Sequence, residues 1–148
     1  MKRTLVIVKP GGVERGLVGE ILSRLEQRQL RLVAADLRTM DVATAKRHYA
    51  EHEGKPFFDR LVASITSAPA LVMVFEGPDD TWRVVRTMIG ATNPAEAAPG
   101  TIRGDLALEM DANLIHGSDS ADAAQREIAI FFPDWLNESN WFAAAFLP

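Results

Sequence analysis

The chain has 148 residues, the length of one domain, and its 47% hydrophobic and 24% charged content are ordinary for a folded globular protein. The apolar content excludes intrinsic disorder, and the absence of Cys excludes a disulfide scaffold. No apolar run is long enough to span a membrane, and the apolar stretch at residues 4–8 is too short for a signal peptide. We therefore expect a cytoplasmic protein without a membrane partner.

The net charge of −4 is unevenly distributed along the chain. Residues 1–40 carry 8 basic and 4 acidic side chains, whereas residues 41–148 carry 8 basic and 16 acidic ones. A nucleic-acid-binding domain usually has a net basic surface, so we do not expect nucleic acid as a partner. Two interpretations of the uneven charge stay open: a local cationic site that binds a small anion, or solvated surfaces that differ in charge.

The hydrophobic pattern predicts strands and helices that alternate along the chain. Short apolar or β-branched runs predict strands, and apolar residues at helical spacing predict helices. The expected strands span residues 4–8, 30–39 and 70–76, and the expected helices span 14–29, 43–52, 57–66, 81–89 and 121–131. Ser120 is the expected N-cap of the last helix. Interleaved elements predict helices packed on a sheet in a layered α/β sandwich, without fixing the strand order.

Residues 90–113 lack a sustained apolar period and are interrupted by prolines and glycines. A structureless segment of this length is uncommon in a compact domain and is usually functional or disordered. This one contains Thr92, Thr101 and Arg103, whose side chains hydrogen-bond anions, and it is not strongly charged. We therefore predict a functional loop.

Three histidines are candidates for chemistry. His48 and His52 are four residues apart on an expected helix, but a zinc-protease helix needs Glu after the first His, where this chain has Tyr49. We expect both to be exposed polar residues. His116 is followed by small and polar residues, so a ligand can approach it; a structural role and a nucleophilic role both stay open.

Lys9, Arg86 and Arg103 are the candidates for binding an anion. Lys9 ends the first strand before a glycine turn and a helix, an arrangement in which backbone N–H groups can meet a phosphate. Residues 9–16 match neither the P-loop nor the dinucleotide-binding spacing. A plain tight turn is therefore the open alternative.

Several blocks of residues stand out in order along the chain: KP at 9–10 with RGLVGE at 15–20, HYAEH at 48–52 with KPFF at 55–58, GATNPA at 90–95, PGTIRGD at 99–105, and HGSDS at 116–120 with REIA at 126–129. Together, from about residue 3 to residue 132, they resemble the nucleoside diphosphate kinase family. The resemblance implies a ferredoxin-like α/β sandwich, in which helices cover a four-stranded antiparallel sheet. It also implies one kinase domain over residues 1–148.

The resemblance implies a Mg²⁺-dependent, ping-pong transfer of the terminal phosphoryl group of a nucleoside triphosphate to a nucleoside diphosphate. His116 matches the position that is phosphorylated, and ATP is the expected main donor. Glu127 lies two turns into the last helix, where it can orient the ring, and Ser118 is expected to hold that carboxylate. Tyr49 matches a residue placed near the catalytic histidine, and Lys9 matches a phosphate-binding residue.

The remaining matched positions are nucleotide-binding ones. Arg86, Arg103 and Thr92, with Lys9, match phosphate-binding residues, Asn113 matches the sugar-binding residue, and Phe57 matches the aromatic on which the base stacks, with Leu61 and Met110 around it. Stacking accepts every base, which predicts broad nucleotide specificity. No protein ligand is expected for Mg²⁺, which the nucleotide phosphates would mainly hold.

The alternative from another class is a catalytically silent ferredoxin-like module that binds nucleotides or single-stranded nucleic acid. The presence of His116, Glu127, Lys9 and Arg103 argues against silence, and the acidic net charge argues against nucleic acid.

The chain departs from the family pattern at three places. Gly11 stands where Asp is common, Asp111-Ala112 stand where Gly-Arg is frequent, and residues 133–148 form a divergent apolar tail. The tail holds the large aromatics Trp135, Trp141, Phe142 and Phe146, whose burial would stabilise a contact by several kcal/mol. We expect a homo-oligomer, with a hexamer favoured over a tetramer and the tail at a subunit interface.

Overall fold

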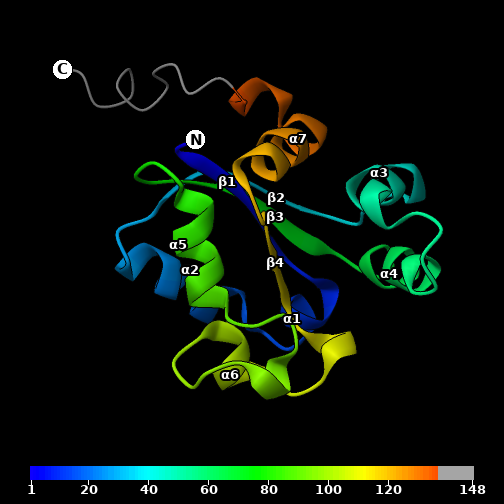
Figure 1. Cartoon of the computed structure of the whole chain (residues 1–148), viewed down its shortest axis with the longest axis horizontal. Helices are drawn as coiled ribbons and strands as arrows, with labels where there is room; N and C mark the ends of the chain where they lie inside the picture. The colour runs from blue at the N-terminus through cyan, green and yellow to red at the C-terminus, as the bar shows by residue number, and fades with distance from the viewer. Residues whose placement is uncertain (137–148) are drawn as a thin grey trace.

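The computed structural model describes residues 1–136, which form an antiparallel sheet with helices on both faces (Figure 1). The four strands are β1 (Arg3–Val8), β2 (Arg31–Arg38), β3 (Ala70–Glu76) and β4 (Ile115–Gly117), in the order β2-β3-β1-β4. Every neighbouring pair is antiparallel. With α2 between β1 and β2 and α5 between β3 and β4, this is the βαββαβ arrangement of the ferredoxin-like fold. The fold implied by the resemblance is confirmed.

The helices of the described part are mostly short. They are α1 (Pro10–Glu14), α2 (Val18–Gln27), α3 (Val42–His48), α4 (Phe58–Ile65), α5 (Thr81–Ile89), α6 (Ile102–Leu106) and α7 (Ala121–Phe131). Single 3₁₀ turns lie at Ala50–His52, Pro94–Glu96, Met110–Ala112 and Pro133–Trp135. The N-cap assigned to the last helix is confirmed, because Ser120 Oγ accepts a hydrogen bond from the Ala123 backbone N–H at 2.9 Å.

Three predicted segments differ from the structure in extent. The helix predicted at 14–29 is shorter and spans only Val18–Gln27, because Gly16 adopts a left-handed φ of 70° that separates it from α1. The helix predicted at 43–52 ends at His48. The segment 90–113 is not structureless: α6 forms within it, capped by Thr101 Oγ1, which accepts from the Gly104 N–H at 3.0 Å.

β1 and β3 are buried on both faces, and this explains their unbroken apolar runs. Alternate residues of β1 enter two different cores: Leu5 and Ile7 pack with residues of α3, α4 and α7, whereas Val6 and Val8 pack with residues of α2, α5 and α6. Figure 1 shows α2 and α5 on one side of the sheet and α3 and α4 on the other. β4 pairs with β1, so that His116 lies opposite Ile7 at the centre of the molecule.

The start of the tail packs on its own domain. Trp135 and Leu136 are partly buried against the core that contains α7, and Arg3 Nη1 donates to the Trp135 carbonyl at 2.9 Å. Trp135 thus packs in part on its own domain, because the turn after α7 brings it back to β1, and its place at a subunit interface stays a prediction. Trp141, Phe142 and Phe146 lie outside the described residues.

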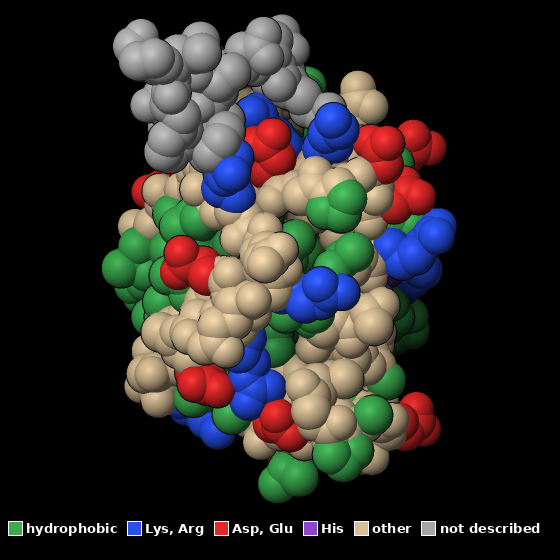
Figure 2. Space-filling model, turned by 90° about the vertical axis from the view of Figure 1, so that its left-hand side faces the viewer, with side chains coloured by type: hydrophobic (Ala, Val, Ile, Leu, Met, Phe, Trp, Pro, Cys, Tyr) green, Lys and Arg blue, Asp and Glu red, His purple; other side chains and the backbone are tan. Residues whose placement is uncertain are grey.

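The surface that carries α2 and α5 mixes acidic and basic side chains and has no patch of a single sign (Figure 2). Within residues 1–136, no helix combines the length and the apolar character that crossing a bilayer requires.

Candidate active site

A cavity of about 530 Å³ opens between two helical segments, one formed by α3 and α4 and the other by α6 and the turn Met110–Ala112. Elements far apart in sequence supply its walls. The predicted site residues that line it are Lys9, Tyr49, Phe57, Leu61, Arg86, Thr92, Arg103, Met110, Asn113, His116 and Glu127. The remaining predicted residue, Ser118, lies behind Glu127. The structure thus brings all the predicted positions to one place.

His116 stands on β4 with its ring held at one nitrogen. Its Nε2 lies 2.6 Å from Oε1 of Glu127, which projects from α7 and is only 3% exposed. Ser118 Oγ donates to the same carboxylate oxygen at 3.0 Å and accepts from the Leu5 backbone N–H at 3.3 Å. Nδ1 of His116 has no hydrogen-bond partner among the described residues, and the side chain is 22% exposed. The ring is therefore oriented by one nitrogen and open at the other.

Gly117 lets β4 lie close to α5. A Cβ at this position would come within 2.7 Å of Ile89 Cδ1, so only glycine fits without a shift. The close approach brings Arg86 of α5 to the strand, where its Nη1 donates to the Gly117 carbonyl at 3.3 Å. The arginine is thereby placed one residue from His116.

His48 is buried, which corrects the expectation that it is an exposed helix residue. It ends α3, is 2% exposed, and packs edge-on against His116 with ring centroids 4.6 Å apart. Neither of its ring nitrogens has a hydrogen-bond partner among the described residues. Burial, reinforced by the nearby His116 and Arg126, lowers the pKa of His48 well below its ordinary value, so the ring is neutral. Burial, with the Glu127 carboxylate nearby, raises the pKa of the neighbouring Tyr49 to about 12.

Three cations line the cavity without an acidic partner. Within the described part of the chain, Lys9, Arg86 and Arg103 form no ion pair, and the hydrogen bonds they donate go to amide and backbone carbonyl oxygens. Burial and the charge of Arg103 lower the pKa of Lys9 to about 8, and burial and Arg86 lower that of Arg103 to about 10. Clustered, desolvated cations destabilise one another until an anion binds between them, so this part of the cavity fits phosphate.

Arg103 also organises the backbone that leads to His116. Its guanidinium donates to the carbonyls of Asn113 at 3.2 Å, Ile115 at 2.6 Å and Gly90 at 3.2 Å. Between the first two lies Leu114, whose φ of 71° is strained for a branched side chain. The Leu114 carbonyl accepts from the Lys9 backbone N–H at 2.8 Å. These bonds hold the strained turn in place.

The opposite part of the cavity is apolar and more open. Phe57 at the start of α4 and Met110 are both exposed, with Leu61 partly buried beside them. Asn113 connects this end to the cations, because its Oδ1 accepts from Lys9 Nζ at 2.7 Å and its Nδ2 donates to the Thr92 carbonyl at 3.3 Å. An apolar platform beside a cation cluster suits a base joined through a sugar to phosphates.

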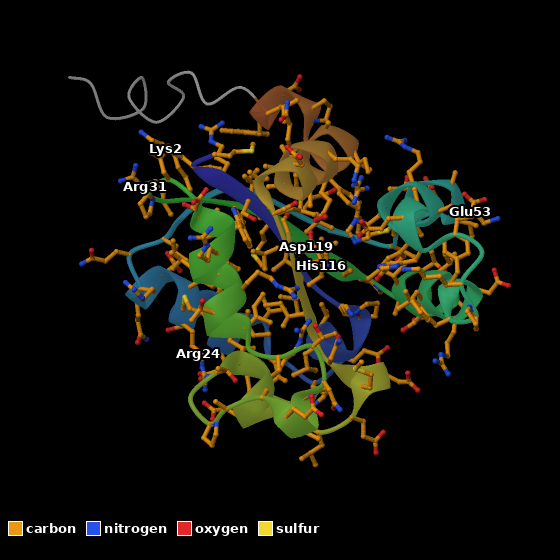
Figure 3. The ribbon with its side chains drawn as sticks, viewed as in Figure 1. Lys2, Arg24, Arg31, Glu53, His116 and Asp119 are labelled. Atoms are coloured by element: carbon orange, nitrogen blue, oxygen red, sulfur yellow. The ribbon has the colours of Figure 1, made fainter. Side chains whose placement is uncertain are left out.

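Sequence reasoning missed several lining residues. Besides His48, they are Glu51, His52, Arg60, Ser64, Ile65, Asp111, Gly117 and Asp119. Figure 3 shows Asp119 close to His116 near the centre of the molecule. Of the missed residues, Gly117 and Asp119 stood within the block at 116–120. The missed residues of α4 showed only helical periodicity in the sequence.

A ferredoxin-like sheet that presents an oriented histidine to a cluster of unpaired cations beside an apolar platform defines a nucleotide-binding phosphotransferase. The sequence profile of the nucleoside diphosphate kinases matches residues 2–135. The chain therefore belongs to the nucleoside diphosphate kinase family. It transfers the terminal phosphoryl group of a nucleoside triphosphate to a nucleoside diphosphate through a phosphohistidine.

Individual relatives agree with this assignment. The chain is 58% identical over 141 residues to a nucleoside diphosphate kinase of Chloroflexus aggregans, covering 95% of this chain and 93% of that protein. It is 58% identical over 134 residues to one of Methanosarcina barkeri, covering 90% and 89%. The solved structure of a halophilic nucleoside diphosphate kinase from Halobacterium salinarum in complex with CDP matches with a TM-score of 0.88 and 52% identity, covering 97% of this chain and 96% of that one.

Proposed function

We propose that His116 is the residue that is phosphorylated, and that Nδ1 is the attacking atom. Glu127 engages Nε2 at 2.6 Å, so the lone pair of Nδ1 is left for the terminal phosphorus. In the first half-reaction the N–P bond forms, the bond from that phosphorus to the bridging oxygen breaks, and the diphosphate leaves. In the second, a terminal oxygen of the acceptor diphosphate attacks the phosphorus and the N–P bond breaks. This hydrogen bond is the observation that carries the assignment.

Lys9, Arg86 and Arg103 stabilise the phosphoryl group in flight. Charge spreads over its oxygens in the transition state, so positioned cations supply much of the catalysis. The absence of ion pairs to these three side chains in the described part of the chain supports this role. Ser118 holds Glu127, and Tyr49, packed next to His48, fixes the wall behind the ring.

The base stacks on Phe57 with Leu61 and Met110 beside it, Asn113 binds the sugar, and Thr92 helps to bind phosphate. Phe57 is exposed enough to receive a ring, and stacking does not discriminate among bases. Broad nucleotide specificity follows, with ATP as the main donor. The CDP complex of the Halobacterium salinarum relative supports the binding of a nucleoside diphosphate here.

Mg²⁺ binds together with the nucleotide, whose phosphates hold it, and not in a site built from protein ligands. Among residues 1–136, the one cluster of potential metal ligands, His48, His116 and Glu127, offers two nitrogens and one carboxylate, whereas Mg²⁺ prefers six oxygens. The fit is therefore to phosphate oxygens, with Asp119 at the cavity wall as the residue available to hold the ion's waters. Bound there, Mg²⁺ would neutralise part of the phosphate charge.

We place the enzyme in the cytoplasm, where its substrates are made and used, as one domain of residues 1–148 and as a homo-oligomer, a hexamer rather than a tetramer. Nucleic acid is not a partner, in keeping with the net charge of −4. Two departures from the family pattern differ in their relation to the site. A Cβ at Gly11 would meet nothing within 4 Å, whereas Asp111 lines the cavity, is 70% exposed and has its Oδ1 3.7 Å from Arg60 Nη2.

The test is phosphorylation of His116. Incubation with γ-labelled ATP and then denaturation should leave an acid-labile, base-stable label on the unmutated protein, and none on a His116→Ala variant that still binds nucleotide. Retention of phosphotransfer by His116→Ala within about tenfold would refute the assignment. A protein that binds nucleotide but never becomes labelled would be the silent binding module instead.

A further inference from the structure

His48, His116 and Glu127 bring three ligand atoms of different elements together at the floor of the cavity. One ligand atom from each residue lies within 4.8 Å of the other two. His48 comes from the end of α3, His116 from β4 and Glu127 from α7. Two imidazoles and one carboxylate are the donor set with which proteins hold catalytic Zn²⁺.

His48 has no hydrogen-bonding role that would account for its burial. It is 2% exposed, and both of its ring nitrogens lack a hydrogen-bond partner among the described residues. A buried polar group without a partner is unfavourable, and an ion that accepts its lone pair removes the penalty. His48 also lines the cavity, so an ion can reach it.

We propose that His48, His116 and Glu127 form a binding site for a nitrogen-preferring divalent ion, Zn²⁺, and that its occupation inhibits the enzyme. Ligand atoms around a tetrahedral ion at about 2.1 Å are roughly 3.4 Å apart, a spacing close to that of the three atoms, which lie within 4.8 Å of one another. All three residues line the cavity, so water can supply the fourth ligand. Ser118 already orients Glu127 through its 3.0 Å hydrogen bond, as ligating carboxylates usually require.

Inhibition follows because the ion and the phosphoryl group need the same residues. A Zn²⁺ ion coordinated by His116 and Glu127 withdraws electron density from the ring and breaks the 2.6 Å hydrogen bond that orients it. This part of the inference rests on the role proposed for His116. Mg²⁺ cannot substitute, because it avoids imidazole ligands. The chain's own composition favours a single site, since it has three histidines and no Cys.

Calorimetric titration of the nucleotide-free full-length protein with ZnCl₂, in millimolar Mg²⁺, tests the site directly. We expect one Zn²⁺ per chain, with affinity reduced about tenfold or more in His48→Phe, which keeps an aromatic edge against His116. The matched control His52→Asn alters a nearby histidine outside the cluster and should bind as the unmutated protein does. No binding by the unmutated protein, or equal affinity in His48→Phe, would overturn the proposal.

Glu127→Gln is a second variant should His48→Phe fail to fold, since the amide oxygen can still accept from Ser118. It too should bind Zn²⁺ about tenfold more weakly, and unchanged affinity would overturn the site. Phosphorylation by ATP at buffered free Zn²⁺ then measures inhibition, expressed for each protein relative to its own rate without Zn²⁺; His48→Phe should need about tenfold more free Zn²⁺ or more for the same fractional loss. Tight, His48-dependent binding that leaves phosphorylation unaffected would overturn the proposed inhibition, whereas failure of the role proposed for His116 would show separately as a label on His116→Ala.

Discussion

Replacing Lys9 by Met should stabilise the nucleotide-free protein while disabling it. Burial and the charge of Arg103 lower the pKa of Lys9 from 10.5 to about 8, which corresponds to roughly 3 kcal/mol of unfavourable free energy for the charged form at neutral pH. Lys9 lines an open cavity, so water reduces this penalty to about 2 kcal/mol. Lys9→Met removes it but takes away the 2.7 Å donor of Asn113 Oδ1, a loss of about 1 kcal/mol.

The net gain of about 1 kcal/mol should appear as a rise of about 2–4 °C in the melting temperature at pH 7, with kcat/KM falling about a hundredfold. The pH dependence carries the argument. A lysine whose pKa is lowered on folding destabilises the native state below pH 8, and this effect fades as the pH approaches 10.5, where the unfolded lysine also loses its proton. The advantage of Lys9→Met should therefore shrink between pH 8 and 10.5.

Thermal melts across this pH range, with the exposed Lys46→Met as control, measure the effect. The control should show no such trend, because its lysine is exposed. A Lys9→Met protein that is less stable than the unmutated one at pH 7, or a difference independent of pH, would refute the electrostatic reasoning.

Further predictions concern the residues around the ring and the assembly. Arg103→Lys should lower kcat/KM about a hundredfold and the free energy of unfolding by about 2 kcal/mol, because an ammonium cannot reach three carbonyls at once; kinetics and urea denaturation check both. Glu127→Gln should reduce phosphotransfer less than Lys9→Ala does, since Glu127 orients the ring and holds no developing charge; the reverse order in steady-state assays would contradict these roles. Ser118→Ala should reduce the free energy of unfolding by about 1–2 kcal/mol in urea denaturation, because the buried Glu127 Oε1 loses one of its two hydrogen bonds and keeps only the one to His116. Light scattering should give a hexamer for the full chain and a changed mass or melting temperature after truncation at Phe132; a monomeric full chain would refute the assembly.

β1 and β3 could be predicted from sequence because both their faces are buried, which leaves them as unbroken apolar runs. β4 could not, because three residues that include His116 and Gly117 have no periodicity to detect. The short helix α6 was missed for the same reason, although its cap Thr101 was visible in the sequence. Elements of three to five residues depend on caps and tertiary contacts rather than on a pattern of their own.

The site was predictable only through the family resemblance, since its contacts join distant parts of the chain. Lys9 and Asn113 are 104 positions apart yet share a 2.7 Å hydrogen bond. The burial of His48 was not foreseen, because hydrophobic periodicity assigns a histidine to the solvent face. In the folded protein α3 ends against β4 and α7, and the ring is enclosed by His116 and Phe131.

The most direct test of the central claim is to isolate the phosphorylated protein and offer it an acceptor. After reaction with γ-labelled ATP and removal of nucleotide, each active chain should carry one label, and addition of GDP should move that label into GTP. The same protocol on His116→Ala should yield neither labelled protein nor labelled GTP. A label that GDP cannot remove, or one that His116→Ala also acquires, would contradict a phosphohistidine at His116 as the intermediate.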